Sequence, residues 1–443
     1  MTEQINYNNP FVILFLAGTI GTYIIRQVLK TINWFNRKKN GQTIPQALAA
    51  RPEAACFDTE KLKNINEYEN AKFYYSLPSA FLTLALKITL VCTGFYPWLF
   101  QKITILTGFP NGFKQTYICA FLFMILDSIP EAVLNIPLDL FYEFKIEKKY
   151  GFSKMTAKLW ITDFIKSTVL SIMLTAILMA AAIAILTFMP QSWWILLTCL
   201  LFAFTLIIHV LYPLVIAPIF NKFTPLQDGE LKDKITDLMT NLGFKSDGIF
   251  VMDASKRSGH SNAYFGGLGK SKRIVLYDTL IKQLTTDELV AVLGHELGHY
   301  KLKHIIRKFI IMVPFEFAFM YLLFRIAQNH SIYIGFGFPF AGVNIQAVQF
   351  IGLILAAMVA GSLMEFLNPI TNFFSRKDEF QADAFSARLT KNPDALISGL
   401  IKLNSENLSE LSPSKAYAFW NYSHPPLTER IAALESIKLE LGK

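Results

Sequence analysis

Two histidines and a glutamate, spaced as H-E-x-x-H, are the residues of this sequence with the most specific chemistry. His295, Glu296 and His299 lie in the stretch HELGH. On an α-helix, two histidines four positions apart project from one face, so both imidazoles can reach the same metal ion. In a zinc peptidase, the glutamate takes a proton from the attacking water while the ion polarises the scissile carbonyl. The pattern therefore predicts two ligands and the general base of a zinc-dependent hydrolase.

The sequence around this motif carries the signals of a helix. Thr285 and Glu288 can form a capping box at its start, and apolar residues recur after them without an interrupting proline. Gly294 and Gly298 are poor helix formers, and close approach of another chain segment would explain their presence. The next apolar run follows His304 without a helix breaker, so we expect the metal-binding helix to continue directly into a membrane span.

The composition indicates a membrane protein. Of the 443 residues, 53% are hydrophobic and only 17% are charged, whereas soluble domains carry more charge. The net charge of +9 comes from lysines and arginines beside apolar stretches, which favours membrane orientation over nucleic-acid binding. Seven stretches are long and apolar enough to cross a bilayer: 11–33, 78–100, 117–140, 166–189, 193–218, 306–327 and 347–370.

The charges between these spans predict their orientation. Lysines and arginines follow the first and third spans and enrich the segment 219–305, whereas the opposite loops hold only Lys102 and Lys114. By the positive-inside rule, the N-terminus lies outside and the zinc motif lies in the cytosol. The predicted division is a five-span membrane region (1–225), a cytosolic insertion ending in the zinc helix (226–305), the last two spans (306–372) and a cytosolic C-terminal region (373–443).

Several predicted spans carry ionisable groups that lipid does not tolerate. Any one of them can belong to a buried hydrogen-bonded pair between two helices. Together, and with prolines inside or at the ends of the spans, they indicate an internal hydrated space. These groups are Lys87, Asp127, Glu131, Asp139, His209, Glu316 and Glu365.

The insertion between the fifth and sixth spans is predicted to contain a helix and two strands. Residues 228–242 have amphipathic helical spacing, and 248–255 and 273–280 have the composition of short strands. Asn262 and Tyr264 lie in the Gly- and Ser-rich turn region between these strands. Because peptidases bind substrate as an extended strand against a protein edge, this hairpin is the local candidate for substrate binding. An ordinary β-turn is the alternative.

A third metal ligand must come from another segment, and the best candidate follows the seventh span. In SRKDEFQAD, Glu379 and Asp383 stand one helical turn apart. Glu379 can bind zinc, and Asp383 can accept the free ring N–H of a ligand histidine; a solvated, charge-mixed helix end is the alternative. Asp378 and His304 are weaker ligand candidates. His304 lies five residues beyond the second motif histidine, about 500° around the helix, and is expected to point elsewhere.

The C-terminal tail presents one more histidine. His424 precedes two prolines, and Arg430 follows in a short predicted helix. A donor beside the metal can stabilise a tetrahedral oxyanion. A single surface histidine commonly has no such role. The sequence of the tail alone therefore does not decide between these two interpretations of His424.

Five stretches together resemble the integral-membrane type I CAAX prenyl protease family: HELGH, RKDEFQAD, SHPPLTER, YEFKIEKKYGFSKMT after the third span and VIAPIFNKFTPL before the insertion. The resemblance covers nearly the whole chain. It implies an α-helical polytopic membrane protein, in which seven helices form a barrel around a large hydrated chamber closed by a cytosolic gluzincin-type zinc protease cap.

The resemblance also implies a role for each candidate site residue. By that match, His295, His299 and Glu379 bind Zn²⁺, and Glu296 is the general base. The further roles that the match implies are Asp383 behind the ligands, His424 and Arg430 near the transition state, with Arg430 in contact with substrate, and Asn262 on the substrate backbone. Tyr264, in the same turn region as Asn262, is also expected to contact substrate.

The expected partner is a peptide or protein substrate, with or without a prenyl group on a C-terminal CAAX cysteine, and membrane lipid; the protein is expected to be a monomer. Compact loops and the ending LELGK, which lacks a dilysine signal, favour a bacterial inner membrane, or the endoplasmic reticulum for a eukaryotic chain. Two alternatives stay open: a membrane quality-control protease of heat-shock type without prenyl specificity, and a transporter.

Overall fold

The seven predicted membrane spans are present as long apolar helices. The computed structural model describes residues 4–243, 248–266, 273–340 and 344–442. In this part of the chain, seven helices are long and apolar enough to cross a membrane. They are α1 (Pro10–Asn40), α3 (Thr59–Cys92), α5 (Gly112–Phe141) with η2 (Tyr142–Glu147), α6 (Ala157–Phe188), α7 (Trp193–Leu211) with η3 (Tyr212–Ile216) and α8 (Ala217–Phe220), α12 (His304–Ala327), and α14 (Gln349–Met364) continued by η7 (Glu365–Leu367) and α15 (Asn368–Thr390).

The second span differs from its predicted bounds of 78–100. Helix α3 begins much earlier, at Thr59, and ends at Cys92. Gly94 has a φ of 70°, in the left-handed region that favours glycine, and a separate helix α4 (Phe95–Thr107) follows it. Because the apolar run continues across this turn, hydropathy alone could not show where the span stops.

The metal-binding helix does not continue into the sixth span, so that prediction was wrong. Helix α11 (Thr286–Lys301) ends before Leu302, and Lys303 has a φ of 56°. Helix α12 then begins at His304. A non-glycine residue in the left-handed region is held there by its surroundings rather than by its own preference, and the resulting turn changes the direction of the chain between the two helices.

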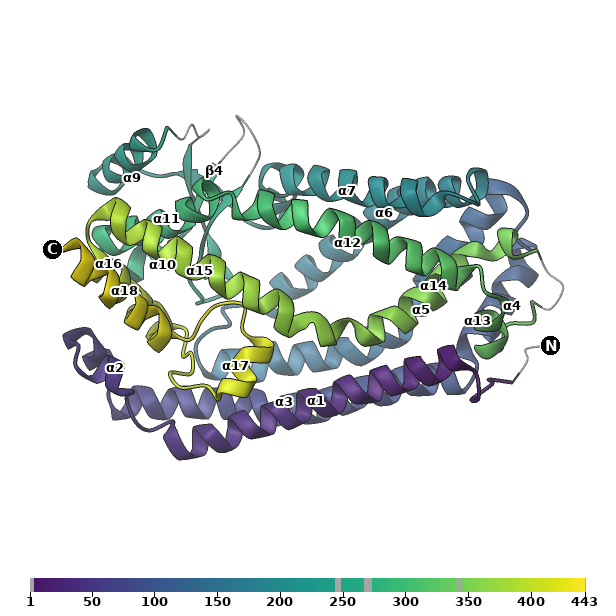
Figure 1. Cartoon of the computed structure of the whole chain (residues 1–443), viewed down its shortest axis with the longest axis horizontal. Coiled ribbons are helices and arrows are strands. Elements are labelled where there is room, and N and C mark those ends of the chain that lie inside the picture. Colours follow the sequence, from purple (N-terminus) through teal and green to yellow (C-terminus); the bar gives the residue numbers. More distant parts are fainter. Residues whose placement is uncertain (1–3, 244–247, 267–272, 341–343, 443) are drawn as a thin grey trace.

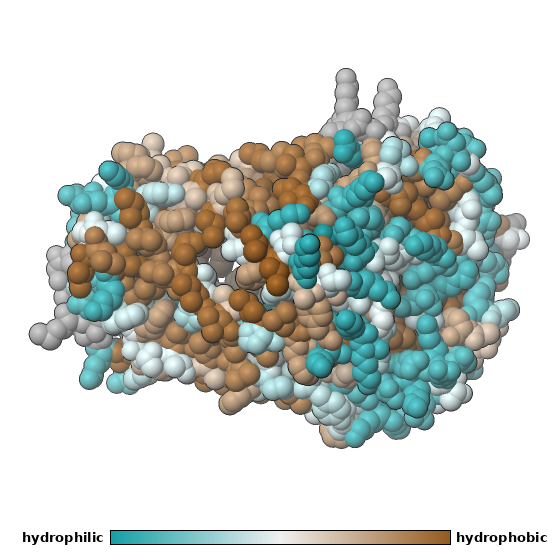
Figure 2. All heavy atoms as spheres, turned by 180° about the vertical axis from the view of Figure 1, so that it is seen from behind, coloured by the Kyte–Doolittle hydropathy of each residue, from teal (hydrophilic) through white to brown (hydrophobic). Residues whose placement is uncertain are grey.

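The spans run along the long axis of the molecule, as Figure 1 shows. Helices α4 and α13 (His330–Gly335) lie at one end, and α9 (Glu230–Asn241), α16 (Pro393–Glu406) and α18 (Leu427–Leu441) lie at the other. Seen from behind, the half formed by the spans is covered by apolar side chains, whereas hydrophilic side chains gather over the other half (Figure 2). The molecule is therefore a helical membrane barrel with a polar cap at one end.

The barrel encloses an internal space lined by polar groups. A cavity of about 710 Å³ lies between α1, α3, α5 and α14. Its lining includes the ionisable residues Arg26, Lys87, Asp127, Glu131 and Glu365, and Arg26 forms an ion pair with Glu365. Four of the seven predicted intramembrane charges therefore line this cavity, whereas Asp139 and His209 line other cavities.

The cap contains a four-stranded sheet in the order β1-β2-β4-β3. The predicted strands are β2 (Ile249–Met252) and β4 (Arg273–Tyr277), but they are parallel neighbours rather than the two arms of one hairpin. The segment between them supplies β3 (Ala263–Gly266), which pairs antiparallel with β4 at the edge of the sheet. On the far side, β1 (Phe223–Pro225) pairs antiparallel with β2.

Short helices complete the cap and its connections. Helix α9 confirms the predicted amphipathic helix at 228–242, and Gly243 after it has a φ of 64°. The cap and its connections contain α2 (Gln46–Ala49), η1 (Pro52–Cys56), α9 (Glu230–Asn241), η4 (Ala254–Lys256), α10 (Asp278–Gln283), α16 (Pro393–Glu406), α17 (Lys415–Asn421) and α18 (Leu427–Leu441). The short helix η6 (Ile345–Val348) instead lies directly before α14.

A buried contact between Arg37 and Glu410 joins the first span to the C-terminal region. The guanidinium of Arg37, at the end of α1, lies 3.3 Å from the carboxylate of Glu410. The side-chain amide of Asn33, one turn earlier, donates to the same carboxylate at 2.7 Å. The Arg37 and Glu410 side chains are only 4% and 5% exposed, so the end of α1 is tied to the segment between α16 and α17 within the protein.

Candidate active site

The helix that carries HELGH is fixed at its start by the predicted capping box. The Thr285 hydroxyl accepts from the backbone N–H of Glu288, and the Glu288 carboxylate accepts from the backbone N–H of Thr285 at 2.8 Å. The same carboxylate lies 2.7 Å from the ammonium group of Lys402 on α16. Since the N-terminal turn of α11 is anchored to a second helix, the motif residues two turns later are held in a defined position.

Helix α15 crosses α11 where the two glycines stand. A Cβ on Gly298 would lie 3.1 Å from Cα of Ala382, and one on Gly294 would lie 2.8 Å from the Ser386 hydroxyl. Both distances are too short for an unperturbed Cβ, so the glycines allow the two helices to approach closely, as the sequence predicted. This approach brings the acidic residues of α15 to the histidines of α11.

The side chains of His295, His299 and Glu379 converge on one point. Their candidate ligand atoms all lie within 4.8 Å of one another. The two histidine Nε2 atoms are 3.2 Å apart, and the Glu379 carboxylate lies 3.4 and 3.3 Å from them. Glu379 Oε2 is buried without a hydrogen-bond partner among the described residues. Two imidazoles and a carboxylate around a shared point fit a divalent ion such as zinc.

Asp383 lies behind the first ligand, His295. Its Oδ1 is 2.8 Å from Nδ1 of His295, so an Nδ1–H donated to this carboxylate leaves Nε2 free for a metal. Arg430 of α18 donates to both oxygens of Asp383, at 2.8 and 2.6 Å. The guanidinium thus holds the carboxylate, because a fully buried charge needs a counter-charge. The expected contact of Arg430 with substrate stays a prediction.

Two residues lie behind the second ligand, His299, and the sequence predicted this place for neither of them. His304, only 1% exposed, has its Nδ1 3.0 Å from Nδ1 of His299. The Nε2 of His304 lies 3.0 Å from Oε1 of Gln381 on α15. The expectation that His304 points elsewhere was therefore wrong, because the turn at Lys303 returns it to α11. The sequence has no glycine, asparagine or proline there to signal the turn, and nothing in it marked Gln381.

Asp378, one of the two weaker ligand candidates, does not belong to the ligand cluster. It forms an ion pair with Arg307 and lies 3.6 Å from the ammonium group of Lys308, both in the first turns of α12. The side chain is buried, with 2% exposure. Its charge is therefore balanced by the sixth span rather than by a metal ion.

Glu296 lines a cavity of about 540 Å³ that also contains His299 and the edge strand β3. Burial raises the pKa of its carboxyl group, and the positive charges of the neighbouring histidines oppose that shift. From β3, Tyr264 and Phe265 line the same cavity. The structure thus brings the proposed general base and the predicted substrate-binding strand to one cavity.

The two residues predicted at this strand have different surroundings. The Tyr264 hydroxyl is buried without a hydrogen-bond partner in the described chain, and burial raises its pKa to about 12. It is therefore a neutral potential donor. Asn262 is exposed immediately before β3, and its side-chain oxygen accepts from the N–H of Ala263 at 2.8 Å. Asn262 thus lies at the start of the edge strand.

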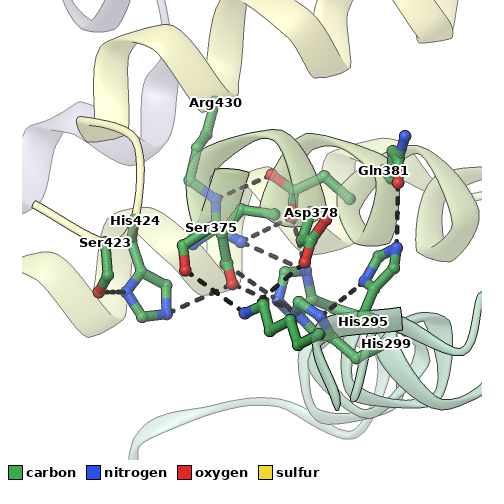
Figure 3. A network of polar contacts seen from close by, with 12 residues as sticks. His295, His299, Ser375, Asp378, Gln381, Ser423, His424 and Arg430 are labelled. Atoms are coloured by element: carbon green, nitrogen blue, oxygen red, sulfur yellow. Dashed lines mark hydrogen bonds and ion pairs between the residues drawn. The ribbon is translucent and has the colours of Figure 1, made fainter. Parts of the chain in front are cut away.

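His424 approaches the ligands from the tail. Its Nε2 lies 3.5 Å from Oε1 of Glu379, and its side chain is 66% exposed. Nδ1 is 3.1 Å from the hydroxyl of Ser423. Figure 3 shows this imidazole on the side of the cluster opposite Gln381. An exposed imidazole beside a ligand carboxylate has the position required of a donor to a substrate bound at the metal.

Comparison with known proteins agrees with this arrangement. Residues 225–438 match peptidase family M48, and residues 33–222 match the CAAX prenyl protease N-terminal family, described as five membrane helices. A CAAX prenyl protease 1 homolog of Oryza sativa subsp. japonica is 36% identical, covering 87% of this chain and 89% of the relative. CAAX prenyl protease 1 of Saccharomyces cerevisiae is 35% identical, covering 86% and 87%.

A solved structure extends the similarity to the fold. The crystal structure of S. mikatae Ste24p superposes with a TM-score of 0.86 at 33% sequence identity, and the match covers 96% of this chain and 99% of that one. The agreement includes both the membrane helices and the cap. With the clustered ligands and the polar chamber, these matches show that the chain belongs to the CAAX prenyl protease group of peptidase family M48 and is a multi-pass membrane metalloprotease.

Proposed function

We propose that this protein is a zinc-dependent endopeptidase that cleaves peptide bonds in the cavity beside β3. The observation that carries the proposal is the convergence of His295, His299 and Glu379, with Glu296 in a cavity bounded by an edge strand. The proposed ligands, the proposed base and the proposed substrate-binding strand thus lie within one site. The apolar side chains of Leu297 and Ile305 also line this cavity.

The roles follow from these positions. Zinc, when bound by the two histidines and Glu379, supplies a Lewis acid that polarises the scissile carbonyl. Glu296 takes a proton from the attacking water and returns it to the leaving amine. The edge of β3 holds the substrate backbone as an added strand, with Asn262 and Tyr264 at and along it. His424 donates to the oxyanion, and Arg430 acts through Asp383.

The proposed substrate is a protein with a C-terminal CAAX sequence and a prenylated cysteine. The relatives from rice and yeast carry the name CAAX prenyl protease 1, and the apolar lining beside Glu296 suits a lipidated peptide. We propose that the protein acts as a monomer in contact with membrane lipid and that the cap faces the cytosol. Proteolysis of the tail in sealed vesicles of known orientation tests that side. The bacterial inner membrane, or the endoplasmic reticulum, stays a prediction.

The decisive experiment measures bound zinc and peptide cleavage on the same detergent-purified protein. Two peptides ending in the same CAAX sequence are compared, one farnesylated and one not, for the unmodified protein, Glu296→Gln and Glu429→Gln. Glu429 is an exposed glutamate on α18 and serves as the matched control. We expect Glu296→Gln to retain zinc and lose cleavage, while Glu429→Gln retains both.

The outcomes separate the alternatives. Preferred cleavage of the farnesylated peptide supports prenyl-protein processing, whereas equal cleavage of both peptides favours the quality-control protease. Zinc-free protein, or cleavage unchanged in Glu296→Gln, would contradict the proposed mechanism.

A further inference from the structure

The two histidine ligands are held on their Nδ1 sides by different acceptors. His295 faces the carboxylate of Asp383, which is paired with Arg430. His299 faces a second imidazole, that of His304, at 3.0 Å. His304 is itself in contact with Gln381 at 3.0 Å. The second ligand thus has a neutral support of two residues, and neither belongs to the proposed ligand set.

The hydrogen-bond directions in this support are fixed by the need to bind a metal. Nε2 of His299 faces the other ligand atoms at 3.2 and 3.3 Å, so its lone pair must be free for the ion. In a neutral imidazole the proton is then on Nδ1, and His299 donates to Nδ1 of His304. The proton of His304 must therefore be on Nε2, where Oε1 of Gln381 accepts it. Each polar atom in this series of hydrogen bonds from His299 to His304 to Gln381 therefore acts either as a donor or as an acceptor, and no two roles conflict.

We propose that His304, oriented by Gln381, is a positioning residue that accepts the Nδ1 proton of His299 and so holds Nε2 of His299 free for the metal ion. Without an acceptor at this place, the His299 proton could lie on either nitrogen, and the ring could rotate. Residues behind a metal-binding histidine typically change metal affinity about 10- to 100-fold.

The turn between α11 and α12 makes this contact possible. If α11 had continued as one helix, His304 would have lain on another face from His299, since five residues span about 500°. Lys303, with a φ of 56°, ends that continuity and places His304 at the first position of α12. Burial of His304, with 1% exposure, keeps water from competing for the His299 proton. The sixth span thus begins with a residue in contact with the metal site.

A second contact holds the turn at Lys303 against α15, the helix that carries Glu379. Arg307 forms an ion pair with Asp378, the residue directly before Glu379. Gln381, which orients His304, lies two residues after Glu379. The start of α12 is therefore attached to α15 on both sides of the third ligand, and this attachment fixes the distance between His304 and the ligand cluster.

The test measures zinc transfer from the loaded, full-length protein to a chromophoric chelator in detergent. His304→Ala removes the acceptor. His304→Asn places an amide oxygen near the position of the lost Nδ1, whereas His304→Gln carries its amide further out, near the position of Nε2. We expect zinc affinity to fall about 10- to 100-fold in His304→Ala and His304→Gln, to be largely kept in His304→Asn, and to fall less in Gln381→Leu.

Two controls keep a folding defect distinct from a ligand effect. The thermal midpoint of each variant is measured with the zinc removed, so that loss of metal is not mistaken for loss of fold. His330→Ala replaces an exposed histidine on α13 and should change neither quantity. A fall in zinc affinity without a fall in the zinc-free midpoint supports the positioning role.

The inference rests on the proposed role of His299 as a metal ligand, and a further variant separates the two. Unchanged zinc affinity in His299→Ala would contradict the proposed ligand set itself. Loss of zinc in His299→Ala, with unchanged affinity in His304→Ala, would overturn only the role of His304. Equal losses in His304→Ala and His304→Asn would also overturn it, because they would show that the ring volume matters and the acceptor does not.

Discussion

Oδ1 of Asp383 lies 2.8 Å from Nδ1 of His295, on a carboxylate that no solvent reaches. Arg430 donates to both oxygens of that carboxylate, so the buried negative charge has a buried partner. The metal site is therefore continuous with the C-terminal helix α18, which supplies Arg430. A change at this place should affect both the metal and the docking of the tail.

Replacing Asp383 with asparagine should weaken zinc binding about 10- to 100-fold, because the neutral amide is a poorer acceptor for His295. The thermal midpoint should also fall, since Arg430 would keep a buried charge without its partner. Chelator competition and thermal unfolding measure the two effects. Asp228→Asn, at a side chain that is 93% exposed, is the matched control. Zinc affinity equal to that of the control would show that Asp383 does not support the ligand.

Gly298→Ala should separate the helices that carry the ligands. The added Cβ would meet backbone atoms of Ala382 at 3.1 and 3.2 Å, and overpacking of this kind costs about 1–3 kcal/mol. We expect a lower thermal midpoint and weaker zinc binding. Gly361→Ala is the control, since its Cβ would have no atom within 4 Å and alanine favours the helix by about 1 kcal/mol. The close-packing argument fails if both variants behave alike.

Local signals in the sequence were sufficient for much of this structure. The seven spans follow from apolar stretches, and the start of α11 follows from the Thr285 and Glu288 side chains, which act on their own backbone. The glycines of α11 correctly indicated a close neighbour, because the absence of a side chain has few other uses in a helix. For the residue that lies beside the motif histidines, the sequence offered Glu379 only as one of several candidates.

The features that sequence reasoning missed depend on contacts between distant segments. The turn at Lys303 has no local signal, and it decides that His304 faces His299. Gln381 was not distinguishable from any polar residue at a helix surface until α12 was placed beside α15. The direction of Arg430 was likewise set by Asp383, 47 residues earlier in the chain. Periodicity describes one helix at a time and contains no information about such pairs.

Removing the His424 imidazole should slow catalysis without releasing the metal. His424 lies 3.5 Å from Glu379 but is 66% exposed, so it can face a substrate while the three other side chains hold the ion. Loss of one oxyanion donor typically costs about 10²- to 10³-fold in kcat. We expect that loss in His424→Ala, with little change in KM or in bound zinc. Loss of zinc would instead identify His424 as a ligand, and unchanged kcat would exclude the proposed role.

Glu410 should make the stability of the protein depend on pH. Burial raises the pKa of this carboxyl group from 4.5 to about 7, against the lowering effect of Arg37. The folded state therefore favours the protonated form. The stabilisation that Glu410 contributes through this preference is fully present below about pH 4.5 and is lost as the pH rises through about 7. Glutamine at this position resembles the protonated form at every pH and can still accept from Asn33.

The thermal midpoint of the unmodified protein should thus fall as the pH rises through this interval, and the thermal midpoint of Glu410→Gln should fall less. In Glu429→Gln, at an exposed position, the thermal midpoint should change with pH as steeply as in the unmodified protein. The comparison must be made between slopes rather than at one pH, because other groups titrate in both proteins and contribute equally. A slope in Glu410→Gln equal to that of the unmodified protein would show that Glu410 is ionised throughout, and that its pairing with Arg37 outweighs the cost of burial.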